Sequence, residues 1–186
     1  MTSPDERKPD LRVEQIAAFG SGDLHDLCDA AEAAIVDGGG FGWLKPPQRS
    51  SLESYWRGVL LVPERDLFVA RLDGVIAGSA QLLRPTANNE AGAKVGVLTT
   101  FFLAPWARGF GLAFRTVQAV EAAARTAGLA VLSLDVRESQ GRAIEIYEEL
   151  GFQRWGTNPW YAFVDGRWMK GFYYSKLLDD GEETAS

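Results

Sequence analysis

A glycine-rich loop between an apolar strand and an apolar helix carries residues that could do chemistry. Its sequence is Arg108-Gly109-Phe110-Gly111-Leu112-Ala113, and Pro105 ends the strand before it. A helix that begins here directs free backbone N–H groups and the positive end of its dipole at one spot, which suits an anion. The glycines leave the backbone open to a phosphate group, and Arg108 adds a fork of donors. The segment predicts an anion site; a turn that binds nothing is the alternative.

Two nucleotide-binding motifs do not fit this loop. A Walker loop needs G-x-x-x-x-G-K-[ST], and a dinucleotide fingerprint needs a third glycine, and the segment has neither. A second segment, Gln140 to Phe152, follows about thirty residues later and predicts an amphipathic helix. Tyr147 puts a phenol on its packing face, where a hydroxyl needs a polar partner. A core tyrosine with no further role is the alternative.

Together these segments resemble the GNAT acetyltransferase superfamily. The acyl-CoA loop of that family, Q/R-x-x-G-x-G/A, and its second motif, N-x-x-A-x-x-x-Y-x-x-x-G-F, are both represented in the chain. The matching residues are Arg108, Gly111 and Ala113 for the loop, and Ala143, Tyr147, Gly151 and Phe152 for the second motif. Other stretches, such as 38–44 and 156–177, are similar to tabtoxin-resistance-like acetyltransferases.

The resemblance implies acetyl-CoA as cosubstrate and direct attack of a small-molecule primary amine on its thioester. Tyr147 is then the expected general acid, since a phenol is protonated at neutral pH. Asp135 is the candidate base, with a carboxylate that caps a turn as the alternative, and Glu53 is a weaker candidate. The expected cofactor-binding residues are Phe102, Leu103, Arg108, Gly109, Phe110, Gly111, Leu112, Ala113, Gln140 and Tyr147.

Two positions depart from the family pattern. Gln140 stands where an asparagine is usual, and the strand from Lys94 to Leu103 lacks the carboxylate that relatives often place there as a base. The missing carboxylate keeps open a non-enzymatic acyl-CoA-binding module as an alternative function.

Aromatic residues of three segments are expected to line the acceptor pocket. The strongest candidates are Trp43, Tyr55 and Trp160, with Phe41, Trp56 and Tyr161 beside them. A protein or peptide acceptor would need an open groove, against which the bulky loop after Gly38 argues.

The elements that must position these residues follow from hydrophobic periodicity and turn signals. Strands are expected over 11–16, 66–72, 75–83, 94–103, 130–136, 153–163 and 167–177, and helices over 23–36, 52–61, 110–127 and 139–150, the last with Ser139 as N-cap. Three consecutive strands predict antiparallel pairing, and the β-α-β run from 94 to 136 predicts one parallel crossover. The expected fold is α+β, a GNAT-like mixed and mostly antiparallel sheet flanked by helices, in the order β-α-α-β-β-β-α-β-α-β-β.

Composition bounds the remaining options. The 186 residues fit one domain, with disordered tails at 1–9 and 179–186, and the net charge of −6 argues against nucleic acid as a partner. The one cysteine, Cys28, sits in an apolar helical pattern and is expected to be buried and inert, and one histidine, His25, gives a metal site little to build on. No apolar run approaches a membrane span and no signal peptide is evident, so the cytoplasm is the expected location. A homodimer is one option for the assembly.

Overall fold

The computed structural model describes residues 8–39 and 41–178, and the predicted tails lie outside them except for Lys8 and Pro9. Twelve helices and strands are assigned in this part of the chain. They are β1 (Leu11–Ile16), α1 (Asp23–Val36), α2 (Arg49–Val59), β2 (Arg65–Leu72), β3 (Val75–Leu83), β4 (Val95–Leu103), the short 3-10 helix η1 (Pro105–Ala107), α3 (Leu112–Thr126), β5 (Val131–Arg137), α4 (Gly141–Glu149), β6 (Gln153–Val164) and β7 (Arg167–Leu177). The α+β class and the predicted order of the elements are confirmed.

The described strands form one sheet in the order β1-β2-β3-β4-β5-β7-β6. Strands β1 to β4 pair antiparallel, as do β5, β7 and β6, and β4 and β5 pair parallel across the α3 crossover. The expected parallel crossover is therefore confirmed.

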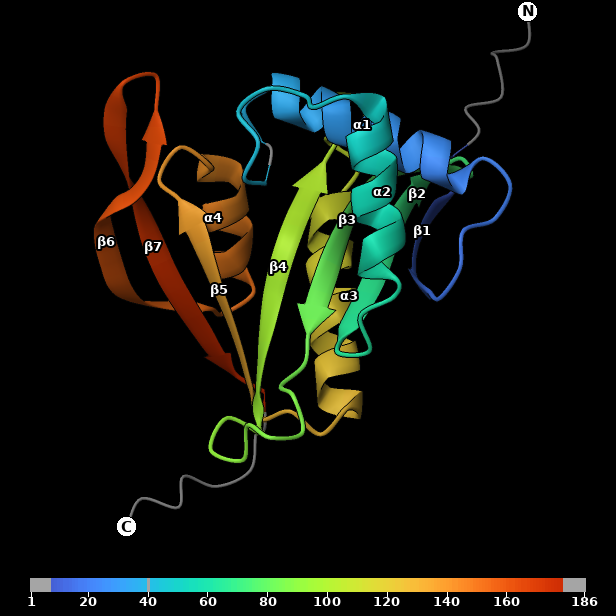
Figure 1. Cartoon of the computed structure of the whole chain (residues 1–186). Helices are drawn as coiled ribbons and strands as arrows, with labels where there is room; N and C mark the ends of the chain where they lie inside the picture. The colour runs from blue at the N-terminus through green and yellow to red at the C-terminus, as the bar shows by residue number, and fades with distance from the viewer. Residues whose placement is uncertain (1–7, 40, 179–186) are drawn as a thin grey trace, which may run out of the picture.

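Strands β4 and β5 separate soon after they meet. Their pairing covers only Val95 to Val97 against Val131 to Ser133, at the end of the sheet where both strands begin. Beyond it the strands diverge, and Figure 1 shows the loop from α1 to α2 passing over the open end. Thr100 bulges out of β4 with a φ of 52°, at the irregularity in its pairing with β3.

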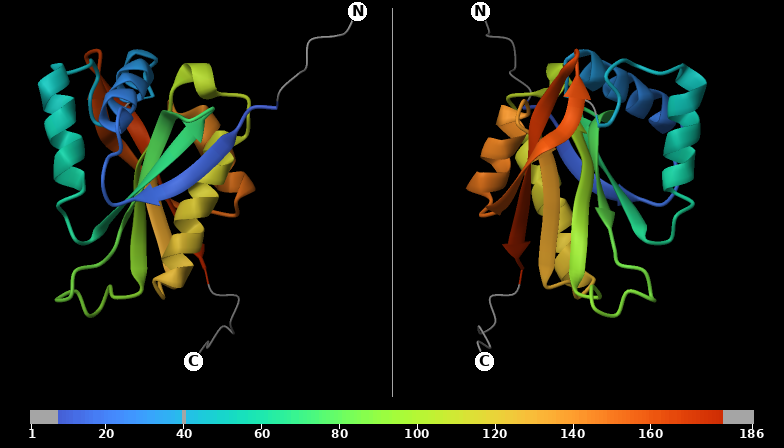
Figure 2. Two further views of the ribbon diagram at one scale, coloured as in Figure 1. Left: turned by 90° about the vertical axis from the view of Figure 1, so that its right-hand side faces the viewer. Right: turned by 60° about the vertical axis from the view of Figure 1, so that its left-hand side comes forward.

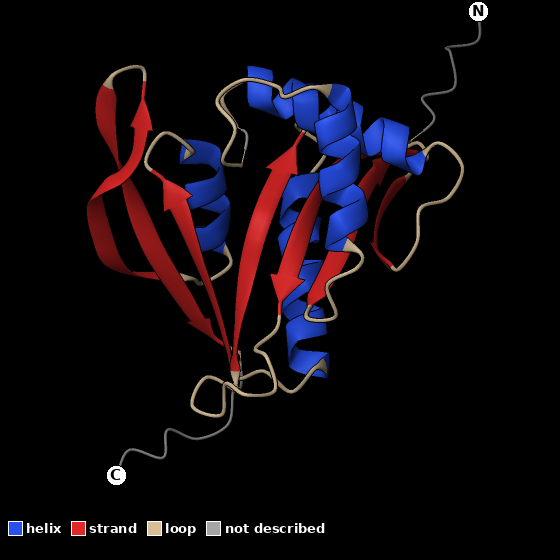
Figure 3. Cartoon of the chain, in the orientation of Figure 1, coloured by secondary structure: helices blue, strands red, loops and turns tan. Residues whose placement is uncertain are grey.

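The helices cover both faces of the sheet. Helices α1 and α2 lie on one face, and α3 and α4 lie on the other (Figures 2 and 3). Each face has its own apolar core: Leu27, Leu52 and Trp56 are fully buried on the first, and Val117 and Leu132 on the second. With a core on both faces, the sheet is a rigid platform for the side chains near the β4–β5 divergence.

The helix after β5 begins one residue later than predicted. Gln140, not Ser139, occupies the N-cap position of α4. The backbone N–H of Gln140 donates to the carbonyl of Arg137, 3.0 Å away, so a turn precedes the helix and delays its start.

None of the described helices is long and apolar enough to cross a membrane. The cytoplasmic location stays a prediction.

Candidate active site

Two neighbouring cavities lie where β4 and β5 diverge. The loop cavity, of about 370 Å³, is formed by residues 37–39, the end of β4, residues 108, 109 and 111–114, and the start of α4. The aromatic cavity, of about 740 Å³, is formed by Gly39, residues 41–44, Tyr55, the middle of β4, the end of β5, Tyr147 and residues 161–164. Four residues line both cavities, so the two spaces share a wall: Gly39, Phe101, Gln140 and Ala143.

The loop cavity is built around the N-terminus of α3. Gly109 and Gly111 have φ values of 86° and 75°, in the left-handed region that favours glycine. Gly111 is the N-cap of α3, and the first helical bond runs from the N–H of Arg115 to its carbonyl at 3.2 Å. The N–H groups of the first turn have no intrahelical partners, so they and the helix dipole favour an anion in the cavity.

Arg108 reaches this cavity already paired with a carboxylate. Its guanidinium lies 2.7 Å from Asp37, and both side chains are about half exposed. An entering phosphate group could replace Asp37 as the partner of Arg108, since phosphate also accepts two parallel N–H bonds. On the opposite wall, the Gln140 amide donates to the carbonyl of Gly38 at 2.8 Å, which ties α4 to the loop after α1.

A close approach of β3 to β4 holds the end of β4 in place. A Cβ on Gly78 would lie 2.4 Å from the carbonyl oxygen of Phe102, so only glycine fits there. Phe102 and Leu103 consequently sit firmly against β3, and both contribute to the loop cavity.

A chain of hydrogen bonds supports the aromatic cavity from below. Arg65 donates to the side-chain oxygen of the buried Gln81 at 2.6 Å, and Gln81 donates to the Tyr55 hydroxyl at 3.2 Å. Because the Tyr55 oxygen accepts from Gln81, its own proton is available to Thr100, 3.4 Å away, or to a molecule in the cavity.

Tyr147 lies on the opposite wall of the aromatic cavity. It is 4% exposed and packs against Phe101 and Phe152, with ring centroids 5.9 and 5.8 Å apart. Burial, helped by the charge of Asp135, raises the pKa of its phenol well above the ordinary value. The hydroxyl is therefore neutral at physiological pH and can donate a hydrogen bond.

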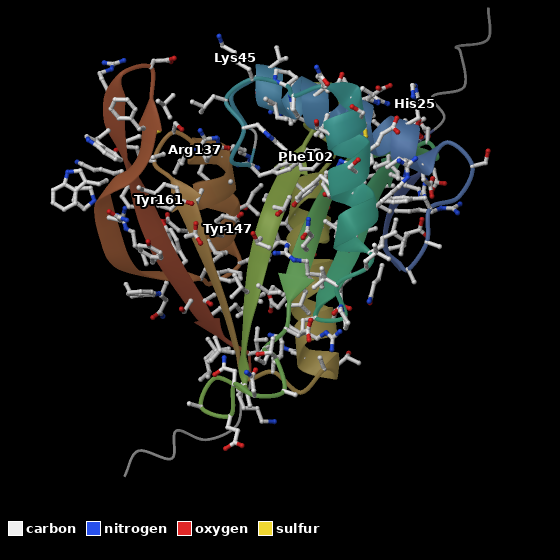
Figure 4. The ribbon with its side chains drawn as sticks, in the orientation of Figure 1. His25, Lys45, Phe102, Arg137, Tyr147 and Tyr161 are labelled. Atoms are coloured by element: carbon white, nitrogen blue, oxygen red, sulfur yellow. The ribbon has the colours of Figure 1, made fainter. Side chains whose placement is uncertain are left out.

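Asp135, near the end of β5, accepts a short hydrogen bond from the Tyr161 hydroxyl of β6. Burial and the hydrogen bond to Asp135 raise the pKa of Tyr161. Both side chains line the aromatic cavity, and Figure 4 shows Tyr147 and Tyr161 on the β5 side of the divergence.

Most of the sequence-predicted site residues lie at one of the two cavities. Tyr147, Asp135, Trp43 and Tyr55 line the aromatic cavity. Eight of the expected cofactor-binding residues line the loop cavity: Phe102, Leu103, Arg108, Gly109, Gly111, Leu112, Ala113 and Gln140.

Four candidates among the described residues line neither cavity. Trp56 is fully buried in the apolar core on the α1–α2 face of the sheet. Phe110 and Trp160 are 43% and 67% exposed and line neither cavity. Glu53 also lies outside both cavities and faces Arg57 at 3.4 Å and Arg49 at 3.8 Å, as a solvated surface charge does.

Cys28 is buried as predicted, and burial raises the pKa of its thiol to about 11, so it is no nucleophile. Within the described residues, no group of three or more His, Cys, Asp or Glu side chains could hold a metal ion.

Sequence reasoning missed the contribution of Asp37 and Gly39 to the loop cavity, and the hydrogen bond between Tyr161 and Asp135. Asp37 follows the end of α1, far from the glycine-rich loop in sequence, and no local pattern links the two segments. The only signal was the run Gly38-Gly39-Gly40, which marks a helix end and does not show what the loop covers.

Known proteins are similar to this chain in sequence and in architecture. The model of the acetyltransferase (GNAT) family matches residues 27–152. A curated protein of Azospirillum brasilense, described as an uncharacterized N-acetyltransferase in the hisH-hisA intergenic region, is 62% identical over 133 residues, which are 72% of this chain and 79% of that protein.

Solved structures reproduce the fold at low sequence identity. An N-acetyltransferase from Staphylococcus aureus Mu50 superposes with a TM-score of 0.77 at 17% identity, over 91% of this chain and 99% of that one. A putative acetyltransferase, yncA of Salmonella typhimurium, solved with its cofactor acetyl-CoA, superposes with a TM-score of 0.72 at 15% identity, over 93% and 96% of the two chains. On the family match and the Azospirillum relative, this chain belongs to the acetyltransferase (GNAT) family and is an acyltransferase.

Proposed function

We propose that the protein transfers the acetyl group of acetyl-CoA to a primary amine of a small molecule by direct attack. The observation that carries the proposal is the shared wall of the two cavities. The N-terminus of α3, which suits an anion, lies on one side of that wall, and a buried phenol and a carboxylate lie on the other. A donor and an acceptor bound on the two sides would meet at Phe101, where β4 bulges.

The loop cavity is the proposed site of the cofactor. The first turn of α3, with Arg108 and the two glycines of the loop, would hold the pyrophosphate through backbone N–H groups and a guanidinium. Phe102 and Leu103, at the end of β4, and Gln140 would flank the pantetheine arm. Among the neighbours of this fold, yncA was solved with acetyl-CoA, which fits the same assignment.

The aromatic cavity is the proposed site of the reaction. The neutral amine attacks the thioester carbonyl, and the carbon–sulfur bond breaks with its electron pair passing to sulfur. Tyr147 is held neutral by burial and can protonate the departing thiolate. Asp135 is the proposed final acceptor of the proton that the amine loses. No covalent enzyme intermediate is needed.

The walls of the aromatic cavity favour a small acceptor. Residues 41–44 and 161–164 line it on two sides, and their bulky side chains favour a small molecule over an extended peptide. Tyr55 would offer its proton to an oxygen of the acceptor, since its own oxygen is held by Gln81. A protein or peptide acceptor and a non-enzymatic acyl-CoA-binding module remain the alternatives, and cytoplasmic location and homodimerisation remain predictions.

Thiol release from acetyl-CoA tests the transfer. The purified protein is mixed with acetyl-CoA and one amine at a time: 2-phenylethylamine, spermidine, lysine, glycine, and a peptide with a free amino terminus. We expect release above the amine-free rate for at least one small amine and less for the peptide. Binding of acetyl-CoA without release for any amine would favour the binding module, and fastest release with the peptide would favour the peptide acceptor.

A pair of variants at Gly111 tests the cofactor site. Gly111→Asp places a negative charge at the N-cap of α3, whereas Gly111→Asn has nearly the same shape without the charge, and both residue types tolerate a positive φ. We expect Gly111→Asp to weaken acetyl-CoA binding at least tenfold more than Gly111→Asn does, as measured by isothermal titration calorimetry. Equal affinities of the two variants for acetyl-CoA would contradict the proposal that the pyrophosphate binds at this helix end.

A further inference from the structure

Tyr161 lines the aromatic cavity and donates its hydroxyl proton to Asp135, and this pair suggests how the amine loses its proton. We propose that Tyr161 is a catalytic residue that accepts this proton on its phenol oxygen while it passes its own proton to Asp135. The proposal rests on the proposed acetyl transfer and fills the place of the carboxylate that β4 lacks. Tyr161 was expected from the sequence only as part of an aromatic wall.

The sheet is shaped so that Tyr161 can reach Asp135 across an intervening strand. Tyr161 belongs to β6 and Asp135 to β5, and β7 runs between them. The pairing of β6 with β7 breaks between Asn158 and Ala162, so Tyr161 lies in an irregular stretch of its strand.

A glycine of β7 makes room for the ring. Gly171 pairs with Asn158 on one side and with Arg137 on the other. A Cβ on Gly171 would lie 2.1 Å from Cγ of Tyr161, so the ring crosses β7 directly over this glycine. The bulge and the glycine together aim the phenol at Asp135.

The hydrogen bond between the two side chains fixes which polar group faces the cavity. A carboxylate has no proton to give, so Tyr161 donates its single hydroxyl proton to Asp135. The phenol oxygen then has only lone pairs to offer to a molecule in the cavity, and it suits an N–H group. An attacking amine presents such a group.

The surroundings keep Tyr161 neutral between turnovers. Burial and Asp135 raise the pKa of its phenol, and Arg137 of β5 opposes them weakly. Tyr173 of β7 and Tyr147 of α4 are further ionisable groups whose electrostatics are coupled to the pair. A phenol with a raised pKa is a poor final proton acceptor but a suitable relay, because the proton ends on Asp135.

The proton transfers balance the reaction. As the amine nitrogen bonds to the carbonyl carbon and the carbon–sulfur bond breaks, the N–H proton passes to the Tyr161 oxygen and the Tyr161 proton passes to Oδ2 of Asp135. The departing thiolate takes the proton of Tyr147. Solvent then removes one proton from Asp135 and returns one to Tyr147, which leaves an amide and a thiol as the only products.

Three variants test the relay with the fastest amine of the panel above. Tyr161→Phe removes only the hydroxyl and keeps the ring over Gly171, and Asp135→Asn keeps an acceptor for Tyr161 but cannot take its proton. Tyr173→Phe is the matched control, since this tyrosine of β7 lines neither cavity. We expect Tyr161→Phe and Asp135→Asn each to lower kcat by about 10²-fold at neutral pH, with the Kd of acetyl-CoA unchanged and Tyr173→Phe at the wild-type rate.

Two readouts separate a proton relay from a structural role. The loss in Tyr161→Phe should shrink as pH rises, because hydroxide can then take the proton in place of the relay. The double variant should be no slower than either single variant, since the two residues act as one unit. If Tyr161→Phe lost its affinity for acetyl-CoA, Asp135→Asn would be the test: a lowered kcat that recovers as pH rises would support the relay, and full activity would overturn it.

The outcomes distinguish this inference from the acetyl transfer on which it rests. Full activity of Tyr161→Phe, or independent and additive losses in the double variant, would overturn the relay and leave the transfer standing. Bound acetyl-CoA without thiol release for any amine would overturn the transfer and the relay together.

Discussion

Tyr147 has a phenol that its surroundings hold in the neutral form. Burial is the main cause of its raised pKa, and the nearby charge of Asp135 acts in the same direction. An ordinary tyrosine ionises only near about pH 10, so a raised pKa leaves Tyr147 protonated throughout the physiological range. Ionisation of Tyr147 should therefore cause no change in rate below about pH 10.

Tyr147→Phe tests the role as general acid. We expect turnover to fall by about 10²-fold, because the thiolate then departs without a proton donor. The affinity for acetyl-CoA should change little, since Tyr147 lines the aromatic cavity and not the loop cavity. Stopped-flow thiol release and calorimetry measure the two quantities, and an unchanged rate would contradict the acid role.

Asp37 forms an ion pair with Arg108 at the loop cavity. Its carboxylate holds the guanidinium at 2.7 Å and adds a negative charge where we expect a pyrophosphate. Asp37→Asn should therefore tighten acetyl-CoA binding severalfold, by removing both the competing partner and the repulsion.

The control for this variant is Glu90→Gln. Glu90 is exposed in the loop between β3 and β4, at the other end of the sheet, and its replacement makes the same change in net charge. We expect calorimetry to show no change for Glu90→Gln, and weaker binding by Asp37→Asn would show that the carboxylate supports the loop instead of competing.

At the scale of elements, the bulge in β4 decides where the two cavities can form. Thr100 has a φ of 52°, which is rare for a β-branched residue and costs about 1–2 kcal/mol. β3 pairs with β4 on both sides of the bulge, at Thr99 and at Phe102. These pairs keep Thr100 in its strained conformation. The bulge lies beyond the last pair of β4 with β5, Val97 with Ser133, in the part of β4 that has separated from β5.

Replacement of Thr100 by glycine should release this strain. We expect Thr100→Gly to leave the free energy of unfolding unchanged or to raise it by up to about 1 kcal/mol, because glycine accepts a positive φ at no steric cost. Thr99 pairs with Gln81, and Thr99→Gly should lower the free energy of unfolding by about 1 kcal/mol. Urea unfolding measures both, and equal losses would mean that the bulge stores no strain.

The sequence predicts regular elements well and this bulge not at all. The strands over 75–83 and 167–177 and the helix over 23–36 have the predicted bounds, because their apolar periods and flanking Asp-Gly or glycine turns are local signals. Val97, Thr99 and Thr100 are residue types that favour an extended strand. The bulge depends on the pairing with β3, which local sequence does not contain.

At the scale of the whole molecule, the same division holds for the candidate site. The glycine-rich loop and Tyr147 can be predicted because each belongs to a short motif. The pairs Arg108–Asp37 and Tyr161–Asp135 join segments that only the folded sheet brings together. Long-range partners of this kind have no periodicity or spacing to reveal them.

Buried tyrosines should set the alkaline limit of stability. Burial and a hydrogen bond to Glu148 raise the pKa of Tyr174 to about 12, and burial raises that of Tyr147 further. A raised folded-state pKa stabilises the protein fully below the unfolded value of about 10, and this contribution is lost as pH rises through the folded value. We expect the free energy of unfolding to decline above about pH 10.

Tyr174→Phe isolates one part of this decline. The variant should be less stable than the wild type at neutral pH by about 1 kcal/mol, since it loses the bond to Glu148. The difference in free energy of unfolding between the variant and the wild type should narrow between about pH 10 and pH 12, because only the wild type has the Tyr174 phenol to titrate. Urea unfolding across that range measures it, and a constant difference would contradict the assignment.

The shared wall between the cavities has a consequence for how two ligands sense each other. Gly39, Phe101, Gln140 and Ala143 face both spaces, so any shift that one ligand imposes on them alters the room available to the other. Thermodynamic reciprocity then requires that the factor by which the donor changes the affinity for the acceptor equals the factor by which the acceptor changes that for the donor. Because these four residues line both cavities, the two binding equilibria are coupled. The fraction of protein that holds both ligands then depends on the product of the two ligand concentrations.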